Sequence, residues 1–556
     1  MNLMIVETPA QAKILTDALG DGWRVESCNG FVRDLPADKL GIDMDSDFRP
    51  TFAVVQGKGN LVRRLMKAIR ESEAVYAATP PTLAGEAMAW HALALSPDAK
   101  DKPIYLVTLP ALTPDSIRAA FAAPRPLDMR LVEAEITQRI INRLIGWSVS
   151  AAVRKVGGVK TAFTYNGMVA LRVLAAHEAQ VAAHTPETRW HASITFERDG
   201  TSFTAQVLNA KGAPLALRNA EQAAQLETLL KQGVFWVDGT GQALKPQSVP
   251  TALTLSELIE IAHRELSLSP ERTLALLHTL YEAGWVTYPG SRPPHHLSEA
   301  ANAFIRHKFG TEYLAPDALV TAEIAPADVN REPEYLPGDG TALYALIWLK
   351  FIAAHMPPAQ ERIMAARILV GNAAGNSYPL ELRATVKMLY FDGWHRLVPT
   401  IDEDEALPFL RQGDELHPAQ IVVDAVNSAP PERYTAASLV SALAQLGTDE
   451  GAASQALDTL HAAEGIVAVD GNLALTERGT ALAAYLASTF DELSSPQYAA
   501  ELNAEIAHIA AGELSRLDVL HAFWSRFGAA LRPTPAPSSR TVGEHKPVVL
   551  RPAEEV

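Results

Sequence analysis

Short apolar runs alternate with amphipathic segments over the first 120 residues of the chain. The runs at residues 3–6, 74–78 and 104–109 predict strands, and the segments at 10–19, 84–95 and 114–122 predict helices. Strands that alternate with helices in this way are typical of a parallel α/β sheet. Function gathers at the carboxyl ends of such strands, which places Glu7 and residues 79–86 at the functional edge of this predicted sheet.

Beyond residue 122 the pattern changes in longer blocks. Helical periodicity predicts helices at residues 131–155, 168–183, 255–265, 270–283 and 341–356, and a mainly helical region with a short hairpin at 466–475 over 435–527. Alternation with period two predicts antiparallel strands over 190–237, 362–370 and 380–389. These two β regions could pair into one sheet, so that the chain leaves and re-enters one domain. The Pro- and Ser-containing tail after residue 532 is predicted to be disordered.

Composition narrows the class of protein. The chain has 556 residues, 48% hydrophobic and 20% charged, which predicts several domains with buried cores. No apolar run is long enough for a signal peptide or a membrane span, so we expect a cytoplasmic protein with no membrane partner. The single cysteine, Cys28, excludes internal disulfides and a cysteine-rich zinc module, and we expect its thiol to be buried. No phosphate-binding glycine motif is present, so no nucleotide cofactor is indicated.

A formal net charge of −16 sets limits on any contact with nucleic acid. Such a charge repels a polyanion at long range, so a binding site must be a local basic patch. Arg63, Lys67 and Arg70 share one predicted helical face, which could hold a phosphate backbone or be an ordinary solvated face.

Tyr288 is the strongest candidate nucleophile. Its segment, residues 280–289, closes an amphipathic helix, turns at a glycine and continues as a short extended stretch. A phenol in this position can attack a phosphodiester and hold a DNA end covalently. The alternative is a packed tyrosine whose hydroxyl bonds to the backbone.

Ordered motifs along nearly the whole chain resemble the type IA DNA topoisomerases of the bacterial topoisomerase I kind. Residues 4–13 (M-I-V-E-T-P-A-Q-A-K) resemble the family's V-E-S-P-A-K-A-K, and residues 30–36 (G-F-V-R-D-L-P) its G-H-V-R-D-L-P. Residues 281–288 (Y-E-A-G-W-V-T-Y) resemble its active-site segment. Further matches lie at residues 85–91, 139–146, 343–348 and 430–435.

The resemblance implies a fold that combines an α/β Toprim domain, mostly helical domains and a β arch in a multidomain toroid. The implied ranges are a Toprim domain at 1–122; a helical, ring-closing domain at 123–187 and 426–532; a β-rich hinge arch at 188–250 and 360–425; a helical domain with Tyr288 at 251–359; and the tail at 533–556.

The resemblance also implies roles for individual residues. Tyr288 would form a 5′-phosphotyrosine, Glu7 would handle protons near the scissile phosphate, and single-stranded or underwound DNA would be the partner. The residues that match DNA-contacting positions are Lys13, Arg33, Arg139, Arg143 and Arg172.

The chain departs from the family where Mg²⁺ would bind. The family's D-x-D-x-E carboxylates, which suit a hard cation, fall on Pro80, Thr82 and Ala84. Glu86, just beyond them, is the remaining candidate metal ligand beside Glu7. Mg²⁺ is therefore implied by the family and poorly supported by the residues present.

The phosphate clamp departs as well. The family's arginine two residues after the tyrosine is Gly290 here, and Arg292 is the candidate replacement. Segments that contact DNA in the family fall on residues 162–167, 322–328 and 447–453 and have lost their cations, although Glu323 is kept. His295 and His296 are interpreted as a loop feature, and His91 as a packing or hydrogen-bonding residue. Two hypotheses follow: a divergent topoisomerase, or a non-catalytic scaffold of the same fold that binds DNA or an unidentified protein.

Overall fold

The first part of the chain folds around a four-stranded parallel sheet. The computed structural model describes residues 1–157, 162–215, 217–315, 320–335, 340–398 and 407–531. Strands β1 (Asn2–Val6), β2 (Trp23–Ser27), β7 (Val75–Ala78) and β8 (Ile104–Leu106) lie in the order β2-β1-β7-β8, and all pairs are parallel. Alternate residues of β1 enter different cores, because successive side chains of a strand point to opposite faces. The predicted parallel α/β domain is confirmed.

Helices cover this sheet, and short strands extend it towards the rest of the molecule. The helices are α1 (Pro9–Leu19), α2 (Gly59–Glu71), α3 (Leu83–Leu93) and α4 (Pro114–Phe121), with the 3₁₀ turn η1 (Pro97–Asp101). The short strands are β3 (Arg33–Asp34), β4 (Ile42–Asp43), β5 (Arg49–Pro50) and β6 (Ala53–Val54), paired as β3–β6 and β4–β5. Cys28 is fully buried, as predicted.

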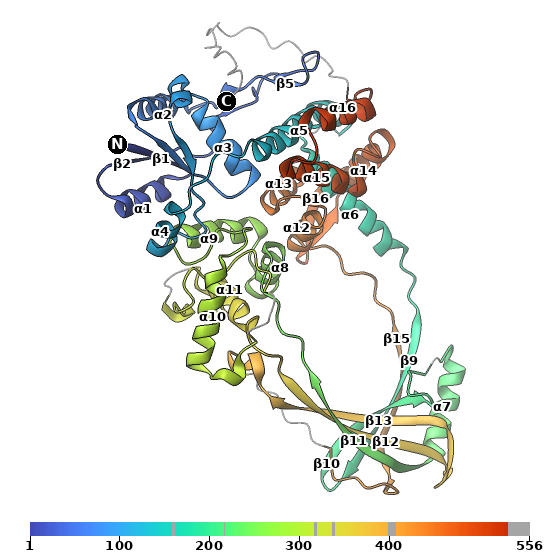
Figure 1. The fold of residues 1–556 in the computed structure, drawn as a ribbon. Coiled ribbons are helices and arrows are strands. Elements are labelled where there is room, and N and C mark those ends of the chain that lie inside the picture. The colour runs from blue at the N-terminus through green and yellow to red at the C-terminus, as the bar shows by residue number, and fades with distance from the viewer. Residues whose placement is uncertain (158–161, 216, 316–319, 336–339, 399–406, 532–556) are drawn as a thin grey trace.

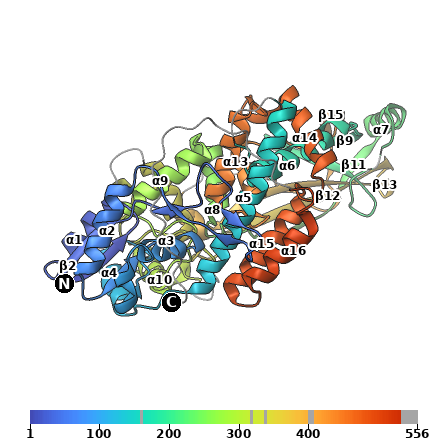
Figure 2. The same cartoon turned by 90° about the horizontal axis from the view of Figure 1, so that it is seen from above.

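Two distant stretches of chain form one helical region. Its first stretch contains α5 (Met129–Gly157) and α6 (Tyr165–Ala183). Its second contains α12 (Ala436–Ala444), α13 (Glu450–Ala462), the hairpin β16 (Ile466–Val469) and β17 (Asn472–Leu475), α14 (Glu477–Thr489), α15 (Pro496–Ala511) and α16 (Arg516–Phe527). Helix α15 packs on α5 and α13 packs on α6, so residues far apart in sequence share one core (Figure 2).

The segment with Tyr288 belongs to a further helical group. Its helices are α8 (Leu255–Leu266), α9 (Pro270–Glu282), α10 (His295–Lys308) and α11 (Thr341–Ala353), with the turns η2 (Thr311–Tyr313) and η3 (Pro333–Tyr335). Residues 295 and 296 begin α10, so the interpretation of His295 and His296 as a loop feature was wrong. Pro294 precedes them with extended backbone, which suits the start of a helix.

A seven-stranded antiparallel sheet forms an arch that completes a ring with the helical groups (Figure 1). Its strands are β9 (Thr188–Arg198), β10 (Thr201–Asn209), β11 (Val234–Pro246), β12 (Gln360–Ala373), β13 (Asn376–Phe391), β14 (Glu415–Leu416) and β15 (Pro418–Asn427), with the turn η4 (Gly393–Arg396) nearby. The order is β14-β11-β12-β13-β10-β9-β15. Pairing of β10 with β13 confirms that the two β regions share one sheet.

The prediction of strands throughout residues 190–237 was wrong in one place. Residues 220–232 form helix α7 (Ala220–Gln232), and Asn219 caps its start because its side chain accepts a hydrogen bond from Gln222 N. Ala223, Leu226 and Leu230 are buried at helical spacing against the sheet. The tail after residue 531 lies outside the described residues, and none of the described helices has both the length and the apolar character that crossing a membrane needs.

Candidate active site

The backbone of Tyr288 is held at the seam between the parallel sheet and the helical group of α8–α11. After α9 the chain turns at Gly284, whose φ of +72° favours glycine and whose position against Leu112 O leaves little room for a side chain. Tyr288 N then donates to Pro110 O at 2.8 Å, in the segment that follows β8. Thr287 exchanges two hydrogen bonds with Ala325, each of 2.9 Å, on the other side.

The ring of Tyr288 is partly buried between aromatic side chains. Tyr281 and His278, both on α9, approach it edge-on with ring centroids at 5.2 and 6.2 Å. The Tyr288 hydroxyl forms no hydrogen bond with a described residue. The backbone-bonded alternative describes Tyr281 instead, because its hydroxyl donates to Leu109 O at 3.0 Å.

Glu7 lies on the opposite side of the seam, at the end of β1. Burial raises the pKa of the Glu7 carboxyl, and the neighbouring charge of Glu282 raises it further. Thr8 Oγ1 donates to Glu282 Oε1 at 2.5 Å and so ties α1 to α9. The negative charge of Glu7 in turn contributes to a raised pKa of Tyr288. The structure brings these two predicted site residues together.

Carboxylates dominate the electrostatics around Tyr288. Burial is the main cause of its raised pKa, and both charges that add to it are carboxylates, Glu7 and Asp449. Asp449 caps α13 by accepting from Ala452 N at 3.0 Å, and Glu450 accepts from Ser256 Oγ at 2.7 Å. Burial also raises the pKa of Glu450.

The sequence identified residues 447–453 as a segment that had lost its cations, and it did not place Asp449 beside the tyrosine. It also missed His278, whose pKa burial lowers. The one sequence signal for His278 was its position on the predicted helix that ends just before Tyr288, ten residues earlier in the chain.

Arg292 does not complete the site in this structure. Its side chain is exposed and forms no hydrogen bond or ion pair with the part of the chain that the structure describes. Gly290, at the family's arginine position, has a φ of +79°, and its N–H donates to Glu323 O at 3.0 Å. Glu323 also accepts from Leu255 N at 2.9 Å, so this kept glutamate caps helix α8.

The residues after β7 do not fit a magnesium site. Thr82 is the N-cap of α3 and accepts from Gly85 N at 3.0 Å, while Ala84 is already helical. Glu86 is 2% exposed, and the Arg125 guanidinium binds both of its carboxylate oxygens, at 2.8 and 2.7 Å. Asp128 N donates to the same carboxylate at 2.6 Å. Among the described residues no group of three or more His, Cys, Asp or Glu side chains is arranged to hold a metal.

The arginines that resemble DNA contacts are already engaged within the protein. Arg139 forms an ion pair with Asp34, and Arg172 Nη2 donates to Asp491 Oδ1 at 2.8 Å. Arg143 donates to backbone carbonyls of residues 35–39, and Arg33 stacks on Trp90 and Phe52 while its Nε donates to His91. Lys13 is exposed.

The three cations of the predicted basic stripe on α2 also have partners within the protein, and two of these partners are carboxylates. Lys67 lies 3.8 Å from Glu71, Arg70 lies 3.6 Å from Asp98, and Arg63 binds Asn60. Its cations therefore support the ordinary surface alternative rather than a free phosphate-binding face.

The described residues form helical groups and a β arch arranged as a ring, with Tyr288 at the seam between the parallel sheet and the helical group of α8–α11. The family comparison agrees: residues 126–521 match the model described as DNA topoisomerase, and residues 2–109 match the Toprim domain. The chain belongs to this DNA topoisomerase family and has the type IA fold. It is similar to full-length topoisomerase I from Thermotoga maritima, with 25% identity, a TM-score of 0.83, and coverage of 96% of this chain and 90% of that one.

Proposed function

We propose that this protein cleaves and rejoins one strand of DNA through Tyr288 and so changes DNA topology. The observation that supports this most directly is the placement of Tyr288 at the seam: its hydroxyl has no partner among the described residues, and the charge of Glu7 is close enough to raise its pKa. A nucleophile without a protein partner, beside a carboxyl that can carry a proton, is the arrangement that transesterification needs.

The proposed step exchanges one phosphoester bond for another, so cleavage and rejoining need no external energy source. The Tyr288 oxygen attacks phosphorus, the bond to the 3′ oxygen breaks, and a 5′-phosphotyrosine forms. Glu7 takes the phenolic proton and returns a proton to the departing 3′ oxygen, so no proton is gained or lost. The raised pKa of Glu7 suits a group that must hold a proton for part of the cycle. Rejoining is the reverse reaction.

Strand passage requires the seam to open while Tyr288 keeps the 5′ end. Among the described residues, few hydrogen bonds cross the seam. Two involve side chains, Thr8 to Glu282 and Tyr281 to Leu109 O, and one joins backbone atoms, Tyr288 N to Pro110 O. The arch sheet connects the separating parts and would remain intact (Figure 1).

We expect turnover to be slow. Removing one preorganised donor to a developing oxyanion costs roughly 10²–10³ in rate, and here Gly290 replaces the family's arginine. Carboxylates around Tyr288 also oppose an approaching phosphate.

The direct test is relaxation of supercoiled plasmid by the full chain, with Mg²⁺ and with a chelator, beside Tyr288→Phe. Relaxation by the wild type that is lost in Tyr288→Phe supports the proposal. A Tyr281→Phe variant is the matched control, because it removes a neighbouring hydroxyl that the structure bonds to the backbone. Equal activity of wild type and Tyr288→Phe, or no relaxation at any enzyme concentration, contradicts it.

A second candidate is a non-catalytic member of the family that binds DNA or a protein. The engaged arginines and the all-carboxylate charge field around Tyr288 favour it. This candidate predicts binding of single-stranded DNA, weakened by salt, with no covalent adduct. Trapping with a denaturant after incubation with a 3′-labelled strand separates the two, because only the first leaves label on the protein.

A further inference from the structure

A histidine on α9 adjoins Tyr288 and has no part in the cleavage step proposed above. The ring of His278 meets the ring of Tyr288 edge-on, with centroids 6.2 Å apart. Its side chain is exposed and forms no hydrogen bond or ion pair within the part of the chain that the structure describes. Tyr281, the other ring of α9 at this place, is buried and bonded to the backbone. A basic side chain that a ligand can reach therefore lies beside the candidate nucleophile.

Two carboxylates from different helices act on His278. Glu282 lies four residues later on the same face of α9, and Asp449 caps α13, which packs on α9. Both charges favour the protonated ring. Solvent reaches His278, yet the surrounding protein desolvates the ring enough to outweigh both charges, so its pKa is lowered from the ordinary value of 6.5. The ring is therefore mostly neutral at neutral pH when no ligand is bound.

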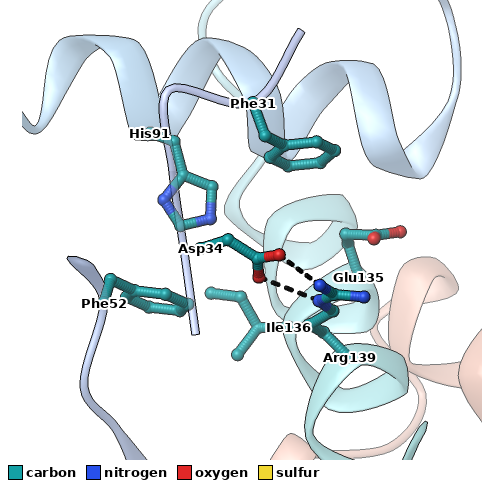
Figure 3. Close-up of a pocket in the computed structure, with 7 residues that line it drawn as sticks. All are labelled: Phe31, Asp34, Phe52, His91, Glu135, Ile136 and Arg139. Atoms are coloured by element: carbon teal, nitrogen blue, oxygen red, sulfur yellow. Dashed lines mark hydrogen bonds and ion pairs between the residues drawn. The ribbon is translucent and has the colours of Figure 1, made fainter. Parts of the chain in front are cut away.

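The positive charge that a phosphate needs is missing around Tyr288. The charges that act on this tyrosine are those of Glu7 and Asp449, and both are negative. Arg139 is held elsewhere: Figure 3 shows its guanidinium joined to the carboxylate of Asp34. A phosphate that approached Tyr288 would add a further negative charge to this field, and that costs free energy unless a cation balances it.

We propose that His278 is the phosphate-binding cation of this site and becomes one by taking up a proton from solvent when a DNA phosphate enters beside Tyr288. The imidazolium would donate a ring N–H to a non-bridging phosphate oxygen, which is a charge-assisted hydrogen bond. The phosphate adds its charge to those of Glu282 and Asp449, and together they offset the desolvation of the ring. The identity of the ligand as a DNA phosphodiester rests on the proposed function, because inorganic phosphate presents similar oxygens.

Proton uptake gives DNA binding a defined dependence on pH. The protonated ring binds phosphate better, so affinity should rise as pH falls from the pKa of His278 in the complex to its lower pKa in the free protein. Outside this window the ring has the same charge in both states, and its contribution is constant. Glu7 and Glu450 also have raised pKa values, and their protonation at low pH would weaken the repulsion of a phosphate as well. Variants of His278 are therefore needed to separate the sources.

Equilibrium binding of labelled oligo(dT) to full-length Tyr288→Phe measures this effect without cleavage, because phenylalanine keeps the ring contact. We expect roughly tenfold tighter binding at about pH 5.5 than at about pH 8. Adding His278→Gln should remove most of this change and leave binding at its weak, high-pH level. Adding His278→Arg should give tight binding even at high pH, because the cation is then permanent. His307→Gln is the matched control, since His307 is an exposed histidine on α10.

NMR of protein with isotope-labelled histidine reports the protonation of His278 directly, and loss of one signal in His278→Gln identifies it. We expect its titration midpoint to lie below 6.5 in the free protein. It should rise by about one pH unit when oligo(dT) saturates the protein, which is the same coupling as a tenfold change in affinity.

An unchanged midpoint in the saturated complex, or no binding of the strand at any pH, overturns the inference. A rise with inorganic phosphate but not with the strand overturns the assignment to DNA. A pH dependence that persists in His278→Gln shows that the carboxylates cause it, and this also contradicts the role of His278. A rise with the strand in a protein that relaxes no plasmid supports the phosphate site and contradicts only the cleavage proposal.

Discussion

Tyr288 illustrates how a residue can keep its position while its surroundings change its chemistry. Its backbone is held by Pro110 and its ring by Tyr281, so geometry presents the hydroxyl at the seam. Burial and two carboxylates raise its pKa, which disfavours the phenolate that attacks phosphorus. The position is preserved by packing, whereas the reactivity depends on charges that other segments supply.

Asp449→Asn should make Tyr288 a better nucleophile. Asparagine keeps the cap of α13 and removes one of the two charges that raise the Tyr288 pKa. Asp449 is exposed, so salt screens its charge, and we expect the variant to relax supercoiled plasmid faster than wild type at low ionic strength and equally fast at high salt. Plasmid relaxation at several salt concentrations, with Tyr288→Phe as the blank, measures the difference. An unchanged rate at low salt would show that Asp449 does not act on Tyr288.

Glu7→Gln should change how stability depends on pH. The native pKa of Glu7 lies above its ordinary value of 4.5, so the folded state binds this proton more tightly than the unfolded chain. That contribution is complete below pH 4.5 and is lost as pH rises through the native pKa. Glutamine removes the loss, so the variant should melt at a higher temperature than wild type near pH 7. Thermal unfolding at several pH values should show the difference disappear towards pH 4.

At the scale of elements, the junction between β7 and α3 shows how the loop with Pro80, Thr82 and Ala84 is built. Thr82 caps the helix, and the first turn packs on Pro80 so closely that a Cβ on Gly85 would lie 2.0 Å from the Pro80 carbonyl oxygen. Arg125, 39 residues beyond Glu86, then binds its carboxylate. The loop is organised as a close strand-to-helix connection in which Thr82 Oγ1 and the Glu86 carboxylate are already bonded within the protein.

Gly85→Ala should therefore be strongly destabilising. The new Cβ must displace backbone, and clashes of this kind cost about 2–4 kcal/mol. Gly59→Ala is the matched control: nothing lies within 4 Å of its Cβ position at the start of α2, and we expect a gain of about 0.5 kcal/mol. Denaturant unfolding of both variants gives the two values. A neutral Gly85→Ala would mean that the junction is looser than the structure indicates.

Periodicity predicted most elements but not all of their boundaries or partners. The parallel sheet and the helices at α5, α6 and α9 follow from local apolar patterns. Helix α7 was missed because it is short and its helical pattern of apolar and polar residues is weak. The segments on either side of it alternate clearly with period two. Helix α7 packs on β15 and shares a core with strands from residues 360–391, which no local pattern reports.

At the scale of the whole molecule, the charge of −16 coexists with arginines that are neutralised locally. Arg172 with Asp491 and Arg139 with Asp34 join segments that lie far apart in sequence. A DNA phosphate must displace the carboxylate partner before it can bind one of these arginines. The affinity for DNA therefore depends on how readily this exchange occurs.

Asp491→Asn should increase affinity for single-stranded DNA. It frees Arg172, so one more phosphate can be neutralised, and the slope of log K against log salt should become steeper by about 0.7. We expect a gain of roughly two- to fivefold at low salt. Asp115→Asn is the matched control: it changes the net charge equally and frees Arg118 on α4. Similar gains in both variants would show a general charge effect instead of a contact by Arg172.

The sequence by itself determined the class of fold, the candidate nucleophile and the absence of carboxylates at residues 80, 82 and 84, because apolar periodicity and ordered motifs are local properties. Only the tertiary structure decided what surrounds the tyrosine. Asp34 forms an ion pair with Arg139, which lies 105 residues later in the chain. The charge of Asp449 acts on Tyr288 although strands of the arch separate these two residues in sequence. Electrostatics depends on distance in space, which a chain of this length sets by folding back on itself, and so the charge field of the site could not be inferred from the order of its residues.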